Sequence, residues 1–164
     1  MTAPYEKALS YALSLLALRA RGRKEMAEKL AGKKYEADVI DAVLVRLAEL
    51  HYLDDERFAQ DYFQYQLNRG KGVDAIRFDL SRKGIDPALT ERLVRAYRED
   101  PAVEVGQIKD LARRKLKRLQ DVPPRDAARR LTGFLARRGF SLDGIRTALR
   151  DLRVESSEEK DTIE

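Results

Sequence analysis

Eight basic residues in the last third of the chain have the types and the spacing that bind polyanions. They occur in pairs at helical spacing and form a candidate basic face of Arg113, Arg114, Lys117, Arg118, Arg129, Arg130, Arg137 and Arg138. A guanidinium group binds phosphate oxygens through two parallel hydrogen bonds and keeps its charge at neutral pH. Six or more such contacts make the affinity for nucleic acid fall steeply with salt. Pairing with the carboxylates of a protein partner is an alternative that is also salt-sensitive.

The net charge of +5 is unevenly distributed along the chain. Residues 1–108 carry 18 basic and 18 acidic groups, residues 109–153 carry 14 and 5, and residues 154–164 carry 1 and 5. The net charges of the three stretches are therefore 0, +9 and −4. An excess of this size favours a polyanion-binding surface over a charged helix face that serves only solubility. The acidic end could compete with the polyanion for that surface.

The other candidates for chemistry have simpler explanations. Asp54 and Asp55 precede a helical stretch, where helix capping explains both better than contact with a partner or a metal or acid/base site does. Gly70-Lys71-Gly72 lacks the strand and further glycines of a nucleotide-binding loop, so we interpret it as a hinge between helices. His51 is the only histidine and there is no cysteine. We expect no catalytic residue, no metal and no cofactor, and therefore no enzyme.

Three aromatic residues, Phe58, Tyr62 and Tyr65, recur at the spacing of one helix face. Such stripes usually belong to the core. Stacking of single-stranded bases on exposed rings beside cations is the alternative. Phe63 and Tyr11 carry the same ambiguity.

A six-residue signature occurs three times, at residues 30–35, 80–85 and 135–140, with the form Leu-x-x-basic-(Gly/Lys)-apolar. Apolar residues at helical spacing precede and follow each copy, so the signature is a turn between two helices. Gly84 and Gly139 stand where a helix ends in a left-handed residue. The first copy has Lys34 instead, and must strain slightly or end its helix differently.

The pattern predicts an all-α chain of three tandem three-helix repeats that form an elongated, curved array. The repeats span residues 1–53, 54–100 and 101–153, and an acidic disordered tail follows at 154–164. The predicted helices lie near residues 5–20, 23–32, 36–51, 55–69, 72–83, 86–98, 102–119, 124–138 and 141–152. The absence of cysteine and of a long apolar run indicates a cytoplasmic protein without a membrane segment.

The segment Tyr52–Ala59, between repeats one and two, carries the most specific motif. Together with Lys71-Gly72, the second signature copy and the upstream stretch 17–21, it resembles the RecX family. The resemblance runs from about Lys7 to Leu152. One departure is Gly22, where the family commonly has a serine that would cap the second helix.

The resemblance implies a bacterial modulator of the RecA recombinase that lodges on the RecA filament on DNA. There it would inhibit strand exchange and ATP hydrolysis and favour filament disassembly. We expect a monomer that contacts the RecA filament and single- or double-stranded DNA without strong sequence preference. An independent DNA-binding protein, including a dimeric transcription factor of helix-turn-helix type, is the alternative, and a helical scaffold for an acidic protein is a third.

Overall fold

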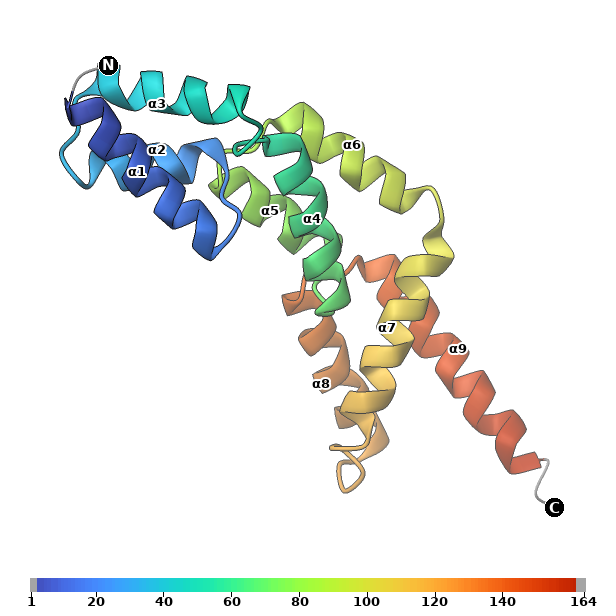
Figure 1. Ribbon diagram of the computed structural model, residues 1–164. Coiled ribbons are helices and arrows are strands. Elements are labelled where there is room, and N and C mark those ends of the chain that lie inside the picture. Colours follow the sequence, from blue (N-terminus) through green and yellow to red (C-terminus); the bar gives the residue numbers. More distant parts are fainter. Residues whose placement is uncertain (1–2, 162–164) are drawn as a thin grey trace. The chain divides into compact units, whose positions relative to one another are not determined.

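The computed structural model describes residues 3–161, and side chains through Arg153. Within the described residues there are helices and turns and no strand, so the all-α prediction is confirmed (Figure 1). The helices are α1 (Ala3–Leu18), α2 (Arg23–Ala31), α3 (Ala37–Glu49), α4 (Asp55–Asn68), α5 (Val73–Arg82), α6 (Pro87–Arg98), α7 (Pro101–Leu116), α8 (Pro124–Arg137) and α9 (Leu142–Asp161).

The end of α9 differs most from the sequence prediction. The other predicted helix ends lie within about three residues of those observed, but α9 continues to Asp161 instead of ending near Leu152. The side chains of residues 154–161 and all of residues 162–164 lie outside the described residues. The acidic disordered tail expected at 154–164 therefore stays a prediction.

Short polar side chains begin several of the helices. Asp86, Asp100 and Ser141 each accept a hydrogen bond from a backbone N–H two or three residues ahead, at 2.9, 3.0 and 3.0 Å. These bonds satisfy N–H groups that have no partner inside the helix. A proline follows Asp86 and Asp100 at the first helical position, where its missing N–H costs nothing.

The turn at each signature copy ends in a left-handed residue. Gly84 and Gly139 have φ values of 75° and 86°, and Lys34 has a φ of 63°. The first copy therefore keeps the left-handed turn with a lysine in place of glycine, and does not end its helix differently. A left-handed residue with a β-carbon costs about 1 kcal/mol, so the first turn carries more backbone strain than the two glycine turns.

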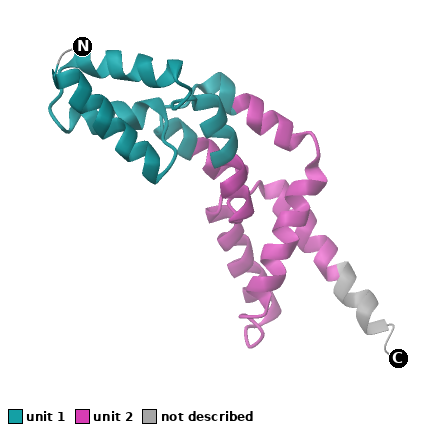
Figure 2. Cartoon of the chain, in the orientation of Figure 1, with its two compact units in different colours: residues 1–62, 79–90 teal, residues 63–78, 91–164 magenta. Residues whose placement is uncertain are grey.

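The described chain divides into two compact units, and the division cuts through the middle repeat (Figure 2). Unit 1 comprises residues 1–62 and 79–90, and unit 2 comprises residues 63–78 and 91–164. Each unit therefore combines one complete terminal repeat with part of α4, α5 and α6.

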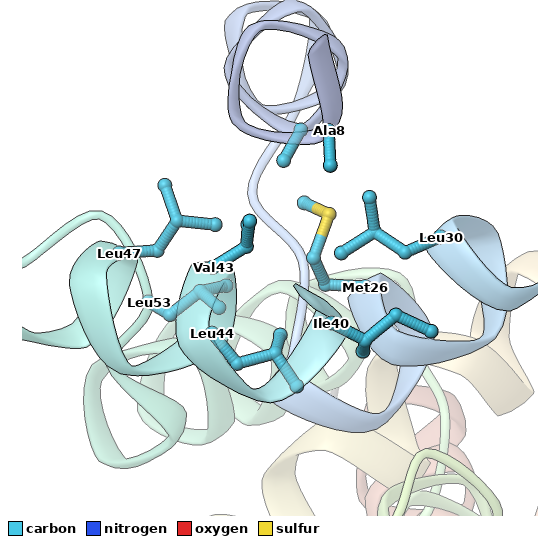
Figure 3. Close-up of a cluster of buried hydrophobic side chains, with 9 residues drawn as sticks. Ala8, Met26, Leu30, Ile40, Val43, Leu44, Leu47 and Leu53 are labelled. Atoms are coloured by element: carbon cyan, nitrogen blue, oxygen red, sulfur yellow. The ribbon is translucent and has the colours of Figure 1, made fainter. Parts of the chain in front are cut away.

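Each unit has its own apolar core. In unit 1 the helices α1, α2 and α3 enclose Ala8, Ala12, Met26, Leu30, Ile40, Val43, Leu44, Leu47 and Leu53 (Figure 3). In unit 2 the helices α7, α8 and α9 enclose Ile108, Ala112, Leu131, Leu135, Phe140, Ile145, Ala148 and Leu152. Met26, Ile76 and Leu131, which align between the three repeats, are all at most 1% exposed. The same repeat position thus supplies a core residue each time.

Close packing at the signature glycines joins each terminal repeat to the part of the middle repeat in the same unit. In unit 1, a β-carbon on Gly84 would lie 2.4 Å from Lys24 Cδ, at the start of α2. In unit 2, a β-carbon on Gly139 would lie 2.5 Å from Ala75, at the start of α5. In both units, the signature turn of one repeat therefore packs against the start of the second helix of the preceding repeat.

The aromatic stripe on α4 is not the core stripe that its spacing favoured. The buried residues of α4 are Ala59, Phe63 and Leu67, while Tyr65 is 55% exposed. Phe58 and Tyr62 are half-buried and stack with their ring centroids 5.9 Å apart. Burial of Phe63 settles its ambiguity in favour of the core.

The two tyrosines of that stripe keep their hydroxyl groups in polar contacts, which explains why they flank the core. The Tyr62 hydroxyl donates to Asp79 Oδ2 at 2.9 Å, and the Tyr65 hydroxyl accepts a hydrogen bond from Arg69 at 2.7 Å. The Arg69 guanidinium also lies 5.5 Å from the Tyr65 ring centroid. Of the three stripe residues, Tyr65 alone combines an exposed ring with an adjacent cation, so base stacking stays a prediction for that residue.

Candidate nucleic-acid interface

Two consecutive helices of unit 2, α7 and α8, position the basic residues singled out in the sequence. Asp100 and Pro101 begin α7, and Pro123 and Pro124 stop the intervening turn and begin α8. The apolar sides of the two helices meet in the core of unit 2, which turns their charged sides outward. The chain reverses between Lys117 and Pro123, so the end of α7 and the start of α8 lie at the same end of the helix pair (Figure 1).

Six of the eight predicted residues lie in the last turn of α7, in the turn that follows it and in the first half of α8. They form a basic turn cluster of Arg113, Arg114, Lys117, Arg118, Arg129 and Arg130, and all six are exposed. The other two, Arg137 and Arg138, lie at the far end of α8. Seven residues of helix, about 10 Å, separate Arg130 from Arg137, so a polyanion could follow the outer side of α8 from one group to the other.

The electrostatic character of the cluster is strongly positive. Residues 113–130 carry eight basic and two acidic side chains, a net charge of +6. Arg113 forms an ion pair with Asp110, and Arg129 forms one with Asp126, each at 3.4 Å between exposed side chains. Exposed ion pairs of this kind contribute about 0–1 kcal/mol, so a phosphate can replace them at little cost.

The sequence reasoning missed two basic residues in this stretch, Lys115 and Arg125. Arg125 is exposed in the first turn of α8. The Lys115 ammonium lies 5.2 Å from the ring centroid of Phe134 on α8, which links the two helices by a cation–π contact. Both residues belong to the same charged run of the sequence, which is the signal that indicates them.

Arg138 has a different role from the cluster. Its guanidinium nitrogen Nη1 donates to the carbonyl oxygens of Arg69 at 3.0 Å and Gly70 at 2.8 Å, and the group lies 5.0 Å from the Phe134 ring centroid. These contacts satisfy carbonyl groups at the end of α4 that have no helical partner. Arg138 therefore joins two turns of unit 2, and we leave it out of the interface, whereas its neighbour Arg137 is exposed.

The glycine turn that receives Arg138 is a close-packed junction. The backbone N–H of Gly72 donates to the Arg138 carbonyl at 2.7 Å, and that of Asp74 donates to the Gly139 carbonyl at 3.2 Å. A β-carbon on Gly72 would lie 2.1 Å from the Gly139 carbonyl carbon. The segment Gly70-Lys71-Gly72, which the sequence suggested only as a hinge, is thus pinned to the turn between α8 and α9.

The paired aspartates are helix caps, but they cap two different helices. Asp54 Oδ1 accepts from the Arg57 N–H at 3.0 Å and caps its own helix α4. Asp55 Oδ1 accepts from the Arg23 N–H at 2.8 Å and so caps α2, whose N-cap residue Gly22 has no side chain to do so. Repeat two therefore supplies the cap that Gly22 cannot.

A groove of about 410 Å³ in unit 1 is lined by charges of both signs, which makes it a poor phosphate site. Its lining combines four cations, three carboxylates and one tyrosine, namely Arg19, Lys24, Arg82, Lys83, Glu25, Glu28, Asp79 and Tyr62. Burial raises the pKa of Glu25, but hydrogen bonds and charges from Arg19 and Arg21 outweigh it and hold that pKa below 4.5. Glu25 thereby stays ionised and ties the end of α1 to α2.

The described part of the chain offers neither a metal site nor a membrane-spanning helix. No group of three or more histidine, cysteine, aspartate or glutamate side chains there could hold a metal ion. No helix there is long and apolar enough to cross a membrane.

Comparison with known families matches all three repeats in order. Models described as the first, second and third three-helix domains of RecX match residues 8–47, 54–93 and 102–149. The chain belongs to the RecX family. This confirms the resemblance carried by the motif at Tyr52–Ala59 and the three-repeat architecture.

Curated RecX relatives and solved RecX structures are similar along most of the chain. Regulatory protein RecX of Mycolicibacterium smegmatis is 39% identical over 141 residues, covering 83% of this chain and 74% of the relative, and that of Mycolicibacterium vanbaalenii is 39% identical over 143 residues, covering 83% and 77%. The crystal structure of RecX from Lactobacillus salivarius superimposes with a TM-score of 0.82 at 27% identity and covers 94% of this chain and 99% of that one. A second RecX crystal structure, at 24% identity and a TM-score of 0.77, shares the fold.

Proposed function

We propose that this RecX protein binds the RecA filament on DNA, inhibits its recombinase and ATPase activities, and favours filament disassembly. The observation that carries the proposal is the match of all three repeats, in order, to the three RecX domains. The relatives that cover most of the chain are named regulatory proteins, which agrees with a role in control and not in catalysis.

The basic turn cluster supplies the DNA contact in this proposal. Its side chains are exposed arginine and lysine groups, which bind phosphates without reading the bases. The expected binding is therefore indifferent to sequence and strongly dependent on salt. Each phosphate contact to single-stranded DNA adds about 0.7 to the slope of log affinity against log salt.

The test is the DNA-dependent ATP hydrolysis of RecA on single-stranded DNA while this protein is titrated in at substoichiometric amounts. The proposal predicts inhibition, and predicts that Arg129→Gln with Arg130→Gln relieves part of it by weakening the DNA contact. A matched control, Arg57→Gln with Arg95→Gln, removes the same charge from exposed positions on α4 and α6 and should inhibit like the unaltered protein.

An independent DNA-binding protein is the competing function, since each repeat contains short helices joined by tight turns. It predicts unchanged ATP hydrolysis at equimolar protein while DNA binding persists. A tight dimer with preference for one duplex sequence would likewise count against the RecA proposal.

A further inference from the structure

An exposed aromatic ring in unit 2 lies beside an arginine near the end of α4. Tyr65 is 55% exposed, and Arg69, four residues later on the same side of the helix, is exposed as well. Arg69 Nη1 donates to the Tyr65 hydroxyl at 2.7 Å, and Arg69 Cζ lies 5.5 Å from the ring centroid. The hydroxyl therefore has a hydrogen-bond partner within the helix, while a large part of the ring is open to solvent.

The end of α4 is tied to the rest of unit 2. Arg138 Nη1 donates to the Arg69 carbonyl at 3.0 Å, and the Gly72 N–H donates to the Arg138 carbonyl at 2.7 Å. Helix α4 thus ends against the turn between α8 and α9 (Figure 1). A tyrosine has few side-chain torsions, and the bond from Arg69 restrains them further, so covering this ring costs little conformational entropy.

The ring is linked to the phosphate-binding side of α8. Arg138, which bonds to the Arg69 carbonyl, directly follows Arg137, the exposed arginine of the proposed interface. Tyr65 lies about 6 Å along the helix axis from Arg69, and adjacent Cα atoms such as those of Arg137 and Arg138 are about 3.8 Å apart. One helical turn and one arginine side chain therefore separate the ring from Arg137, which is within the span of a site for about 4–16 nucleotides.

The charges and the ring recognise different parts of DNA. Basic side chains bind the phosphates of a single strand and of a duplex alike. An aromatic ring stacks on the face of a base, and in a duplex the neighbouring base pairs already cover these faces. Every base has such a face, so stacking is tolerant of sequence. An exposed ring beside a cation therefore favours single strands without reading the sequence.

We propose that Tyr65 is a stacking platform for one base of single-stranded DNA and makes this protein prefer single strands to duplex. Arg69 holds the ring through its hydroxyl and adds a positive charge beside the stacked base. Stacking of one base on an aromatic side chain strengthens binding about 5- to 150-fold. The inference rests on the proposed DNA contact of the basic turn cluster and adds the class of strand that the protein selects.

The first experiment compares two forms of the same DNA by fluorescence anisotropy. The probes are a labelled oligonucleotide without hairpins and its duplex with the complementary strand. Tyr65→Ala should weaken binding to the single strand at least about fivefold and leave duplex binding unchanged. Its salt slope should stay that of the unaltered protein, because no charge is lost. Unchanged binding to the single strand, or equal weakening for both probes, would overturn the proposal.

The matched control is Tyr52→Ala, which removes a ring that is 57% exposed in unit 1. It should bind both probes like the unaltered protein. A loss equal to that of Tyr65→Ala would show that the effect is not specific to the ring on α4.

The second experiment separates the ring from its hydroxyl and detects the stacking directly. Tyr65→Phe keeps the ring and should retain most of the affinity for the single strand. The chain has no tryptophan, so Tyr65→Trp places a single indole at the site, and its fluorescence should be quenched by the single strand and not by the duplex. Loss of affinity in Tyr65→Phe equal to that in Tyr65→Ala, or an indole signal that the single strand does not change, would contradict stacking.

The outcomes distinguish this inference from the proposed DNA contact. Arg129→Gln with Arg130→Gln should weaken binding to both probes and lower the salt slope. If it does so while Tyr65→Ala changes neither affinity, the basic turn cluster binds DNA and the stacking proposal fails alone. If the unaltered protein binds neither probe, the DNA contact fails, and the stacking proposal fails with it.

Discussion

Replacing Arg138 by alanine should destabilise the protein without removing a main DNA contact. The change deletes hydrogen bonds to the carbonyl oxygens of Arg69 and Gly70 and a cation–π contact with Phe134. Each hydrogen bond from a charged donor that is partly exposed is worth about 1 kcal/mol, and the cation–π contact is worth a similar amount. The expected loss is about 3 kcal/mol, which lowers Tm by about 10 °C in a protein of this size.

The neighbouring residue gives the matched control. Arg137→Ala removes the same side chain from an exposed position of α8, so it should leave Tm within about 2 °C. Below the melting temperature, Arg137→Ala should weaken binding to a single-stranded oligonucleotide and reduce its salt slope by about 0.7. Arg138→Ala should leave that slope unchanged when measured at 10 °C.

The assays are thermal unfolding followed by circular dichroism and oligonucleotide anisotropy at several salt concentrations. A stable Arg138→Ala variant with a reduced salt slope would refute the separation of the two roles. In that case Arg138 would belong to the interface, and its side chain would contribute little to the stability of the junction between the two turns.

Three further changes test contacts that stabilise the fold, two of them in unit 1 and one in unit 2. Asp55→Ala should lower the free energy of unfolding, measured in urea, by about 1 kcal/mol, because the Arg23 N–H at the start of α2 loses its hydrogen-bond acceptor. Unchanged stability would show that water replaces the carboxylate. Gly72→Ala should lower the free energy of unfolding by more than about 3 kcal/mol, because the added β-carbon would overlap the Gly139 backbone. Gly106→Ala, which adds a β-carbon inside α7 with nothing within 4 Å, should raise it by about 1 kcal/mol. Similar effects of the two changes would contradict the close junction at Gly72. Glu25→Gln should lower the free energy of unfolding at pH 7, because folding lowers the pKa of this carboxyl and so favours its ionised form. The difference in stability between the variant and the unaltered protein should shrink as pH falls below 4.5, where the carboxyl becomes protonated. A difference that does not change with pH would contradict the ion pairs.

Local signals predicted most of the fold. The apolar spacing around the three signature copies located the helices, and Gly84 and Gly139 marked left-handed turns because a residue without a β-carbon adopts them cheaply. Met26, Ile76 and Leu131, which align between the three repeats, are all buried. Repetition made these weak local preferences mutually supporting.

The spacing of residues along the sequence does not predict contacts between segments that are distant in the chain. The sequence placed Asp55 at the start of its own helix, but its carboxylate caps α2, 32 residues earlier in the chain. Similarly, nothing in the sequence around Gly72 shows that another backbone approaches it. Both contacts depend on how one repeat packs on the next, which the local pattern does not encode.

Packing also decided which members of the candidate site are available. Arg137 and Arg138 are indistinguishable as a pair in the sequence, yet one is exposed and the other joins two turns. The spacing of the aromatic stripe on α4 favoured a place in the core. Instead Phe63, one position after Tyr62, is buried in the core, and Tyr65 of the stripe is exposed. The sequence located the charged stretch, and the helix packing selects among its residues.

The most direct measurement is the rate of ATP hydrolysis by RecA on single-stranded DNA as this protein is added at increasing substoichiometric ratios. We expect progressive inhibition that is weakened by Arg129→Gln with Arg130→Gln and retained by Arg57→Gln with Arg95→Gln. Undiminished ATP hydrolysis at equimolar protein, with DNA binding by this protein intact, would contradict it.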